Sequence, residues 1–131
     1  MRVLLDTHAF LWFIGDAPEL SPFARGLIED EDTELLLSAA SLWEMAIKYS
    51  IGKLQLPDKS VPFVEQLKEQ LSLNRIVILP IEPDHIFIVA SLPLRHRDPF
   101  DRLIAAQSLH EHLPLISIDA VLDSYAVNRL W

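Results

Sequence analysis

Residues 2–6 read Arg-Val-Leu-Leu-Asp and residues 115–119 read Leu-Ile-Ser-Ile-Asp, so that in each case a short apolar run leads to an aspartate. Two similar runs lie between them, residues 35–37 before Ser38 and the β-branched segment 75–79. Short apolar runs without alternation are typical of strands buried on both faces. We therefore expect strands over 2–5, 35–37, 75–79 and 115–118, with a short fifth strand over 126–128.

Helical patterns fill the intervals between these runs. They predict helices over 8–14, 22–32, 39–50, 62–73, 83–92 and 99–112, with Ser21 and Ser38 as N-caps and proline in several first turns. Alternating strands and helices indicate an α/β fold with a central parallel sheet and helices on both sides. Ligands of such sheets bind outside the carboxyl ends of the strands, which makes the residues after each strand the first candidates for a site.

Length and composition limit the function further. The 131 residues are enough for a single domain over 1–131, and the absence of cysteine excludes disulfides, thiolate metal sites and a cysteine nucleophile. No apolar run is long enough to span a membrane, so we expect a cytoplasmic protein. The net charge of −8 disfavours binding of nucleic acid by bulk charge, unless metal ions supply the positive charge.

Five acidic residues are expected near one cleft at the carboxyl edge of the sheet. Asp6 and Asp119 directly follow predicted strands. Asp101 lies in the first turn of a predicted helix, with Asp98 close by, and Glu44 lies one to two turns into another. They account for five of the eight excess negative charges. Clustered carboxylates repel one another, and a divalent cation such as Mg²⁺ relieves that repulsion. Without metal, we expect like-charge repulsion to raise several of their pKa values.

Other polar residues near these acids have expected roles in the same cleft. Arg95, Arg97 and Arg102 bracket two of the acids and are placed to bind substrate phosphates. Ser38 and Ser117 are expected to orient neighbouring groups, because neither lies in the Gly-x-Ser-x-Gly motif of a nucleophile.

Each acid also has a purely structural interpretation. Asp6, Asp98 and Asp119 are each placed to cap a following helix, and Glu44 is placed to pair with Lys48 at i, i+4. Against these interpretations, caps have no evident reason to collect at one edge, and Glu44 caps nothing. The set as a whole therefore favours a metal site.

Four segments together resemble the PIN-domain ribonucleases, and most of all the VapC-type toxins of prokaryotic toxin–antitoxin pairs. They are Val3-Leu4-Leu5-Asp6-Thr7-His8, Ser38-Ala39-Ala40-Ser41-Leu42-Trp43-Glu44, Ile116-Ser117-Ile118-Asp119 and the most specific one, the block from His96 to Gln107 with Arg97-Asp98-Pro99-Phe100-Asp101-Arg102. The resemblance covers essentially the whole chain in order. Where the family often has threonine, this chain has Ser117, which keeps the hydroxyl.

The resemblance implies a three-layer α/β/α PIN domain and an endoribonuclease that depends on Mg²⁺ or Mn²⁺. It further implies that Asp6 and Asp101 are the main metal ligands, that Glu44 and Asp119 hold water or a second ion, and that Thr7 and Ser117 support the ligands. Asp98 matches the family block but is less certain as a ligand.

The resemblance also implies partners: an RNA substrate, a VapB-type antitoxin and a second copy in a homodimer. The apolar helix faces around Leu11-Trp12 and Trp43-Ile47 are expected to receive the antitoxin's tail.

Two other functions stay open at this point. One is a phosphatase or phosphoacceptor with Asp6 as nucleophile. That function needs a second acid two positions after the nucleophile, and the presence of His8 there weakens the interpretation. The other is a binding module for RNA or protein without catalysis.

Overall fold

A computed structural model describes residues 1–96 and 98–131. Its strands are β1 (Arg2–Leu5), β2 (Glu34–Ser38), β3 (Val77–Leu79), β4 (Leu115–Ile116) and β5 (Arg129–Leu130). Its helices are α1 (Thr7–Ile14), α2 (Pro22–Glu29), α3 (Ala39–Ser50), α4 (Phe63–Leu73), α5 (Pro83–Ser91), α6 (Pro99–Glu111) and the 3₁₀ helix η1 (Ala120–Tyr125). Within the described part of the chain, no helix has the length and apolar character needed to cross a membrane.

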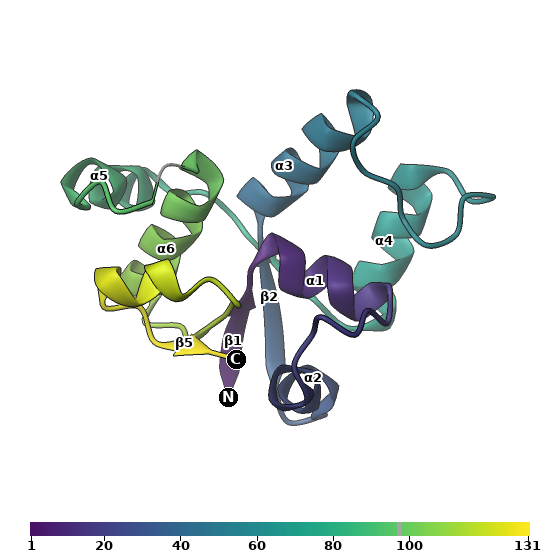
Figure 1. Cartoon of the computed structure of the whole chain (residues 1–131), viewed down its shortest axis with the longest axis horizontal. Helices are drawn as coiled ribbons and strands as arrows, with labels where there is room; N and C mark the ends of the chain where they lie inside the picture. The colour runs from purple at the N-terminus through teal and green to yellow at the C-terminus, as the bar shows by residue number, and fades with distance from the viewer. Residues whose placement is uncertain (97) are drawn as a thin grey trace.

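The five strands form one sheet in the order β3-β2-β1-β4-β5, and every neighbouring pair is parallel. Figure 1 shows α1, α2 and α4 on one side of this sheet and α5, α6 and η1 on the other. The predicted three-layer α/β/α architecture with a central parallel sheet is therefore confirmed.

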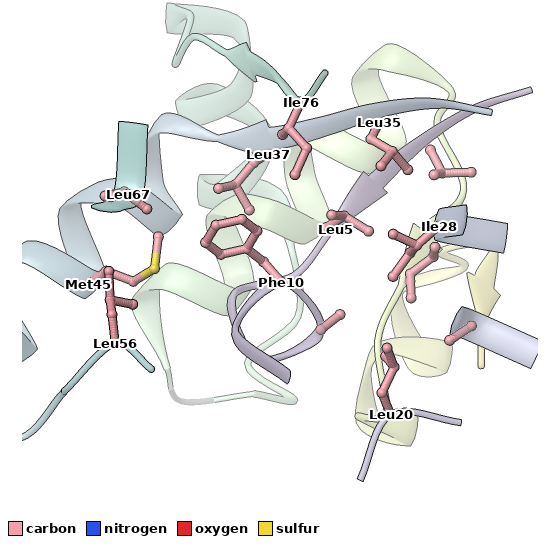
Figure 2. Packing of buried hydrophobic residues seen from close by; sticks show 14 of the residues in the cluster. Leu5, Phe10, Leu20, Ile28, Leu35, Leu37, Met45, Leu56, Leu67 and Ile76 are labelled. Atoms are coloured by element: carbon pink, nitrogen blue, oxygen red, sulfur yellow. The ribbon is translucent and has the colours of Figure 1, made fainter. Parts of the chain in front are cut away.

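Both faces of the sheet are covered, as the strand pattern predicted. Successive side chains of a strand point to opposite faces, so Leu4 and Leu36 pack beneath α6 while Leu5 and Leu37 pack beneath α1. Phe10 of α1 lies next to Leu37 and Leu5 in Figure 2 and is fully buried. Fully burying a side chain of this size stabilises the fold by about 1.5–3 kcal/mol, which fixes α1 against the sheet directly after Asp6.

Four of the five predicted strands differ from the observed ones in their bounds. β2 runs from Glu34 to Ser38 and is one residue longer at each end than predicted. The segment 126–128 is not a strand, because Ala126 ends η1 in the left-handed conformation with φ of 60°, and β5 starts only at Arg129. β3 starts at Val77 because Arg75, with φ of 53°, still belongs to the turn that closes α4. β4 ends at Ile116, since the following residues turn so that the N–H of Asp119 donates to the Ser117 hydroxyl.

Candidate metal centre

The central strands end side by side at one edge of the sheet. Leu5, the last residue of β1, is in register with Leu37 of β2 and Ile116 of β4. The backbone N–H of Asp6 donates to the Ile116 carbonyl at 3.1 Å, which extends this pairing by one residue. In Figure 1, α1 and α3 begin at the upper ends of β1 and β2, so their first turns meet at this edge.

Three of the five predicted acids are helix caps. Asp6 Oδ1 accepts from the N–H of Ala9 at 2.7 Å, Asp98 Oδ1 accepts from Phe100 at 2.8 Å, and Asp119 Oδ1 accepts from Val121 at 3.1 Å. The expectation that caps have no reason to collect at one edge is wrong for Asp6 and Asp119, because helices that follow parallel strands begin at that edge. Capping alone therefore accounts for the positions of Asp6 and Asp119, whereas α6, which Asp98 caps, follows α5 and not a strand. Each of the three acids keeps a second carboxylate oxygen for another ligand.

Glu44 lies on α3, and its side chain is buried at the site. Its side chain is only 4% exposed, and its Oε2 lies 2.8 Å from the ammonium of Lys48, so the predicted i, i+4 pair exists but is not a surface pair. Thr7 Oγ1 lies 2.7 Å from Glu44 Oε1 and 2.9 Å from Ser41 Oγ. A carboxylate only accepts hydrogen bonds, so Thr7 donates to Glu44 and Ser41 donates to Thr7. These bonds tie the start of α1 to α3.

Asp101 and Asp119 meet at a histidine that the sequence reasoning left without a role. His96 Nε2 lies 3.2 Å from Asp101 Oδ2 and 2.5 Å from Asp119 Oδ2. Its place in the same block as Asp98 and Asp101 is the signal that could have identified it. Asp101 comes from the first turn of α6 and Asp119 from the segment after β4, so two distant parts of the chain converge here.

The acids act on one another electrostatically. Burial raises the pKa of Asp101 to about 7, with smaller contributions from the charges of Asp98, Asp6 and Glu44 and an opposing one from His96. Burial also raises the pKa of Asp6, which hydrogen bonds from Ser117 and Ala9 offset only in part. The predicted direction is confirmed for these two acids, but loss of solvation outweighs like-charge repulsion as its cause.

The supporting hydroxyls divide between the acids and the backbone. Ser117 hydrogen-bonds to Asp6 and also accepts from the N–H of Asp119 at 3.1 Å. Ser38 is fully buried and accepts from the N–H of Ala40 at 3.0 Å, so its observed bond caps α3.

The three predicted phosphate-binding arginines have different surroundings. Arg95 is exposed, while Arg97 lies outside the described residues. The guanidinium of Arg102 donates to the carbonyls of Pro93, Val89 and Leu92 and to the Tyr125 hydroxyl, at 2.9–3.3 Å. These bonds fasten the end of α5 to α6 and use the donors that a phosphate would need, so we leave Arg102 out of the phosphate-binding set below.

The gathered side chains form a donor set made mainly of carboxylate oxygens. Buried carboxylates without a counter-charge are costly, and Lys48 pairs with only one of them. Hard divalent cations prefer such oxygen ligands. The chemistry of the set therefore fits a divalent metal ion.

Known proteins resemble this chain in sequence and in fold. Ribonuclease VapC22 of Mycobacterium tuberculosis is 31% identical over 124 residues, which cover 94% of this chain and 91% of that protein. Ribonuclease VapC16 of the same organism is 38% identical over 61 residues, or 47% of this chain and only 40% of that protein.

Solved structures show the same fold at lower identity. A chain in the structure of VapBC2 from Rickettsia felis bound to a promoter DNA fragment has a TM-score of 0.70 and 17% identity, over 99% of this chain and 98% of that one. A chain in a toxin–antitoxin complex from Klebsiella pneumoniae has a TM-score of 0.66 and 15% identity, over 98% and 96%. The family model for the PIN domain matches residues 3–128. With that match spanning nearly all the elements that carry the acids, the chain belongs to the PIN domain family.

Proposed function

We propose that this protein is a metal-dependent endoribonuclease that acts as the toxin of a toxin–antitoxin pair. The observation that carries the proposal is the convergence of four carboxylates at one sheet edge in a PIN domain. Asp6 and Glu44 act electrostatically on Asp101. Asp119 and Asp101 both contact the Nε2 of His96. The sequence relatives named ribonuclease support the same activity. We further propose that residues 1–131 act as one PIN domain.

The proposed metal ligands are Asp6 and Asp101, with Glu44 and Asp119 holding water or a second ion. When bound, Mg²⁺ or Mn²⁺ would polarise the phosphodiester and lower the pKa of the attacking water. Asp98 stays the least certain ligand, because its Oδ1 already accepts two backbone N–H groups of α6.

Other residues would hold the ligands and the substrate. Thr7 fixes Glu44 through its 2.7 Å hydrogen bond, and Ser117 orients Asp6. Ser38 contributes indirectly, because its hydroxyl caps the start of α3, the helix that carries Glu44. Arg95, and Arg97 two residues later in the sequence, would bind phosphates that the acids otherwise repel.

The proposed partners follow from the family and from the exposed apolar surface. Trp43 is 60% exposed on α3 and packs edge-on against Phe100 at 5.2 Å, and Ile47 is exposed one turn further on. These side chains support docking of a VapB-type antitoxin on this helix face. Trp12, by contrast, is partly covered by Trp131 at 5.9 Å. A homodimer and a cytoplasmic location remain predictions.

Cleavage of a labelled mixture of tRNA and rRNA tests the activity. We expect cuts with Mg²⁺ or Mn²⁺, none with EDTA, and none with Asp6→Asn. The matched control is Asp16→Asn, an exposed aspartate after α1 whose side chain is 91% exposed. The expected products carry a 5′-phosphate and a 3′-hydroxyl. Cutting that persists in Asp6→Asn would point to a contaminant and contradict the proposal.

No observation on the described residues favours the phosphoacceptor alternative. Asp6 is only 7% exposed and its Oδ1 caps α1, which is poor placement for a nucleophile. A covalent aspartyl-phosphate formed on incubation with a phosphate donor would nevertheless revive that alternative.

A further inference from the structure

The imidazole of His96 lies among the proposed metal ligands without a role in the proposed function. Its Nε2 and one carboxylate oxygen each of Asp101 and Asp119 all lie within 4.8 Å of one another. The side chain is 16% exposed, so neighbouring groups cover most of it. The question is whether this ring is a metal ligand or a hydrogen-bond donor.

The backbone decides which ring nitrogen carries the hydrogen. The N–H of Asp98 donates to His96 Nδ1 at 3.1 Å, so Nδ1 must offer a lone pair. In a neutral imidazole one nitrogen accepts and the other donates. The hydrogen is therefore on Nε2, which faces Asp101 and Asp119.

A nitrogen that carries a hydrogen has no lone pair for a metal ion. Direct ligation through Nε2 would require the hydrogen to move to Nδ1, and the hydrogen bond from Asp98 would be lost. As a donor, in contrast, Nε2–H hydrogen-bonds to Asp119, and it also places a positive hydrogen near Asp101, whose Oδ2 lies 3.2 Å from the same nitrogen. Carboxylates that bind metals are commonly held in place by such outer hydrogen bonds.

The segment that carries His96 is itself fixed. The N–H groups of Arg95 and His96 donate to the Tyr125 hydroxyl at 3.1 and 2.7 Å, and Arg102 donates to the same oxygen at 3.2 Å. Tyr125 is only 5% exposed at the end of η1. The ring is thus held from both the α6 side and the η1 side, which are the elements next to Asp101 and Asp119.

We propose that His96 is a positioning residue: its Nε2–H holds Asp119 by a hydrogen bond and lies in contact with Asp101, and so it presets both carboxylates for the metal ion. The inference rests on the proposed function, because it concerns the same metal. It adds a residue that acts through the ligands and does not itself touch the metal.

Calorimetric titration of the whole protein with Mn²⁺ is the first test. His96→Ala should weaken binding roughly 10- to 100-fold, the usual effect of losing an outer partner of a metal ligand. His96→Gln should recover part of the loss, since its amide N–H can donate from about the position of Nε2. His112→Asn is the control and should bind as the wild type does, because His112 is exposed at the end of α6 and asparagine tolerates its left-handed conformation with φ of 54°.

Nitrogen NMR of the imidazole rings is the second test and does not depend on any variant folding. His85 is an internal reference, because its Nδ1 accepts from the N–H of Glu82 at 3.0 Å and its Nε2 lies 2.9 Å from Glu111. Both rings should carry hydrogen on Nε2 without metal. On addition of Mg²⁺, His96 should keep that hydrogen while its resonance shifts, and His85 should not respond.

The outcomes separate the two proposals. Loss of the Nε2 hydrogen of His96 on metal binding would make it a ligand and overturn the inference. So would His96→Ala that binds Mn²⁺ as tightly as the wild type, or more tightly, and neither result would touch the proposed function. A wild-type protein that binds neither ion would overturn the proposed function and this inference with it.

Discussion

Replacing Asp101 by asparagine should stabilise the metal-free protein at alkaline pH. In the folded protein the pKa of Asp101 is raised from 3.8 to about 7, chiefly by burial. Below pH 3.8 both folded and unfolded chains are protonated here, and Asp101 costs nothing. As the pH rises towards 7, the unfolded chain ionises while the folded one resists. Stability is therefore lost across this window and stays low above it.

The size of the effect follows from the two pKa values. A pKa difference of roughly three between the folded and unfolded chain lowers the free energy of unfolding at pH 8 by at most about 4 kcal/mol. The side chain is still 26% exposed, and solvent screening reduces this to about 2 kcal/mol. For a chain of this length, about 2 kcal/mol corresponds to a change of about 7 °C in Tm.

The assay is thermal unfolding in EDTA at pH 4, 6 and 8. Asp101→Asn should melt like the wild type at pH 4 and about 7 °C higher at pH 8. Asn keeps a carbonyl that can accept from His96, so that contact is not lost. Adding Mn²⁺ or Mg²⁺ should raise the Tm of the wild type more than that of the variant.

The control is Asp32→Asn, which should follow the wild type at every pH because Asp32 is exposed and its side chain makes no hydrogen bond or ion pair with the described residues. A variant that melts at or below the wild type at pH 8 would refute the argument, since Asp101 would then not be a destabilising charge. Equal melting of the wild type in EDTA and in excess metal would count against the metal site itself.

Four further variants test the surroundings of the site. Phe10→Ala should lower the free energy of unfolding by about 3–5 kcal/mol, measured by urea denaturation, and a loss below about 1 kcal/mol would show that α1 is not anchored by this ring. Thr7→Val should cost about 1–3 kcal/mol, because buried Glu44 loses a donor, and it should also slow RNA cleavage; unchanged stability and rate would remove Thr7 from the site. Arg102→Met should lower the Tm and leave the salt dependence of RNA binding unchanged. Arg95→Gln should leave the Tm unchanged and weaken the salt dependence of RNA binding. A weaker salt dependence in Arg102→Met with an unchanged Tm would restore Arg102 as a phosphate ligand.

The local patterns of the sequence were sufficient for most of the elements. Ser21 and Ser38 begin helices because each side chain accepts from a backbone N–H of the first turn. The apolar runs became buried strands because both faces of a parallel sheet are covered. The patterns failed at Arg75 and Ala126, where residues with ordinary side chains adopt left-handed conformations that nothing in the neighbouring sequence indicates.

The sequence identified the candidate acids, but it did not predict all the contacts of the residues around them. Arg102 was expected on substrate, yet its donors are used by carbonyls at the end of α5. His96 was given no role, because its function depends on a carboxylate that is distant in sequence. Such roles depend on how α5, α6 and η1 pack, which side-chain type does not report.

The sequence by itself determined the alternation of strands and helices, the parallel sheet and the acids at its carboxyl edge, because periodicity and capping are local properties. The tertiary structure decided the strand order, the burial that raises the pKa of Asp101, and the meeting of Asp101 and Asp119 at His96. These features depend on contacts between segments far apart in the chain. Only the closing of the sheet and the packing of helices on its faces brings such segments together.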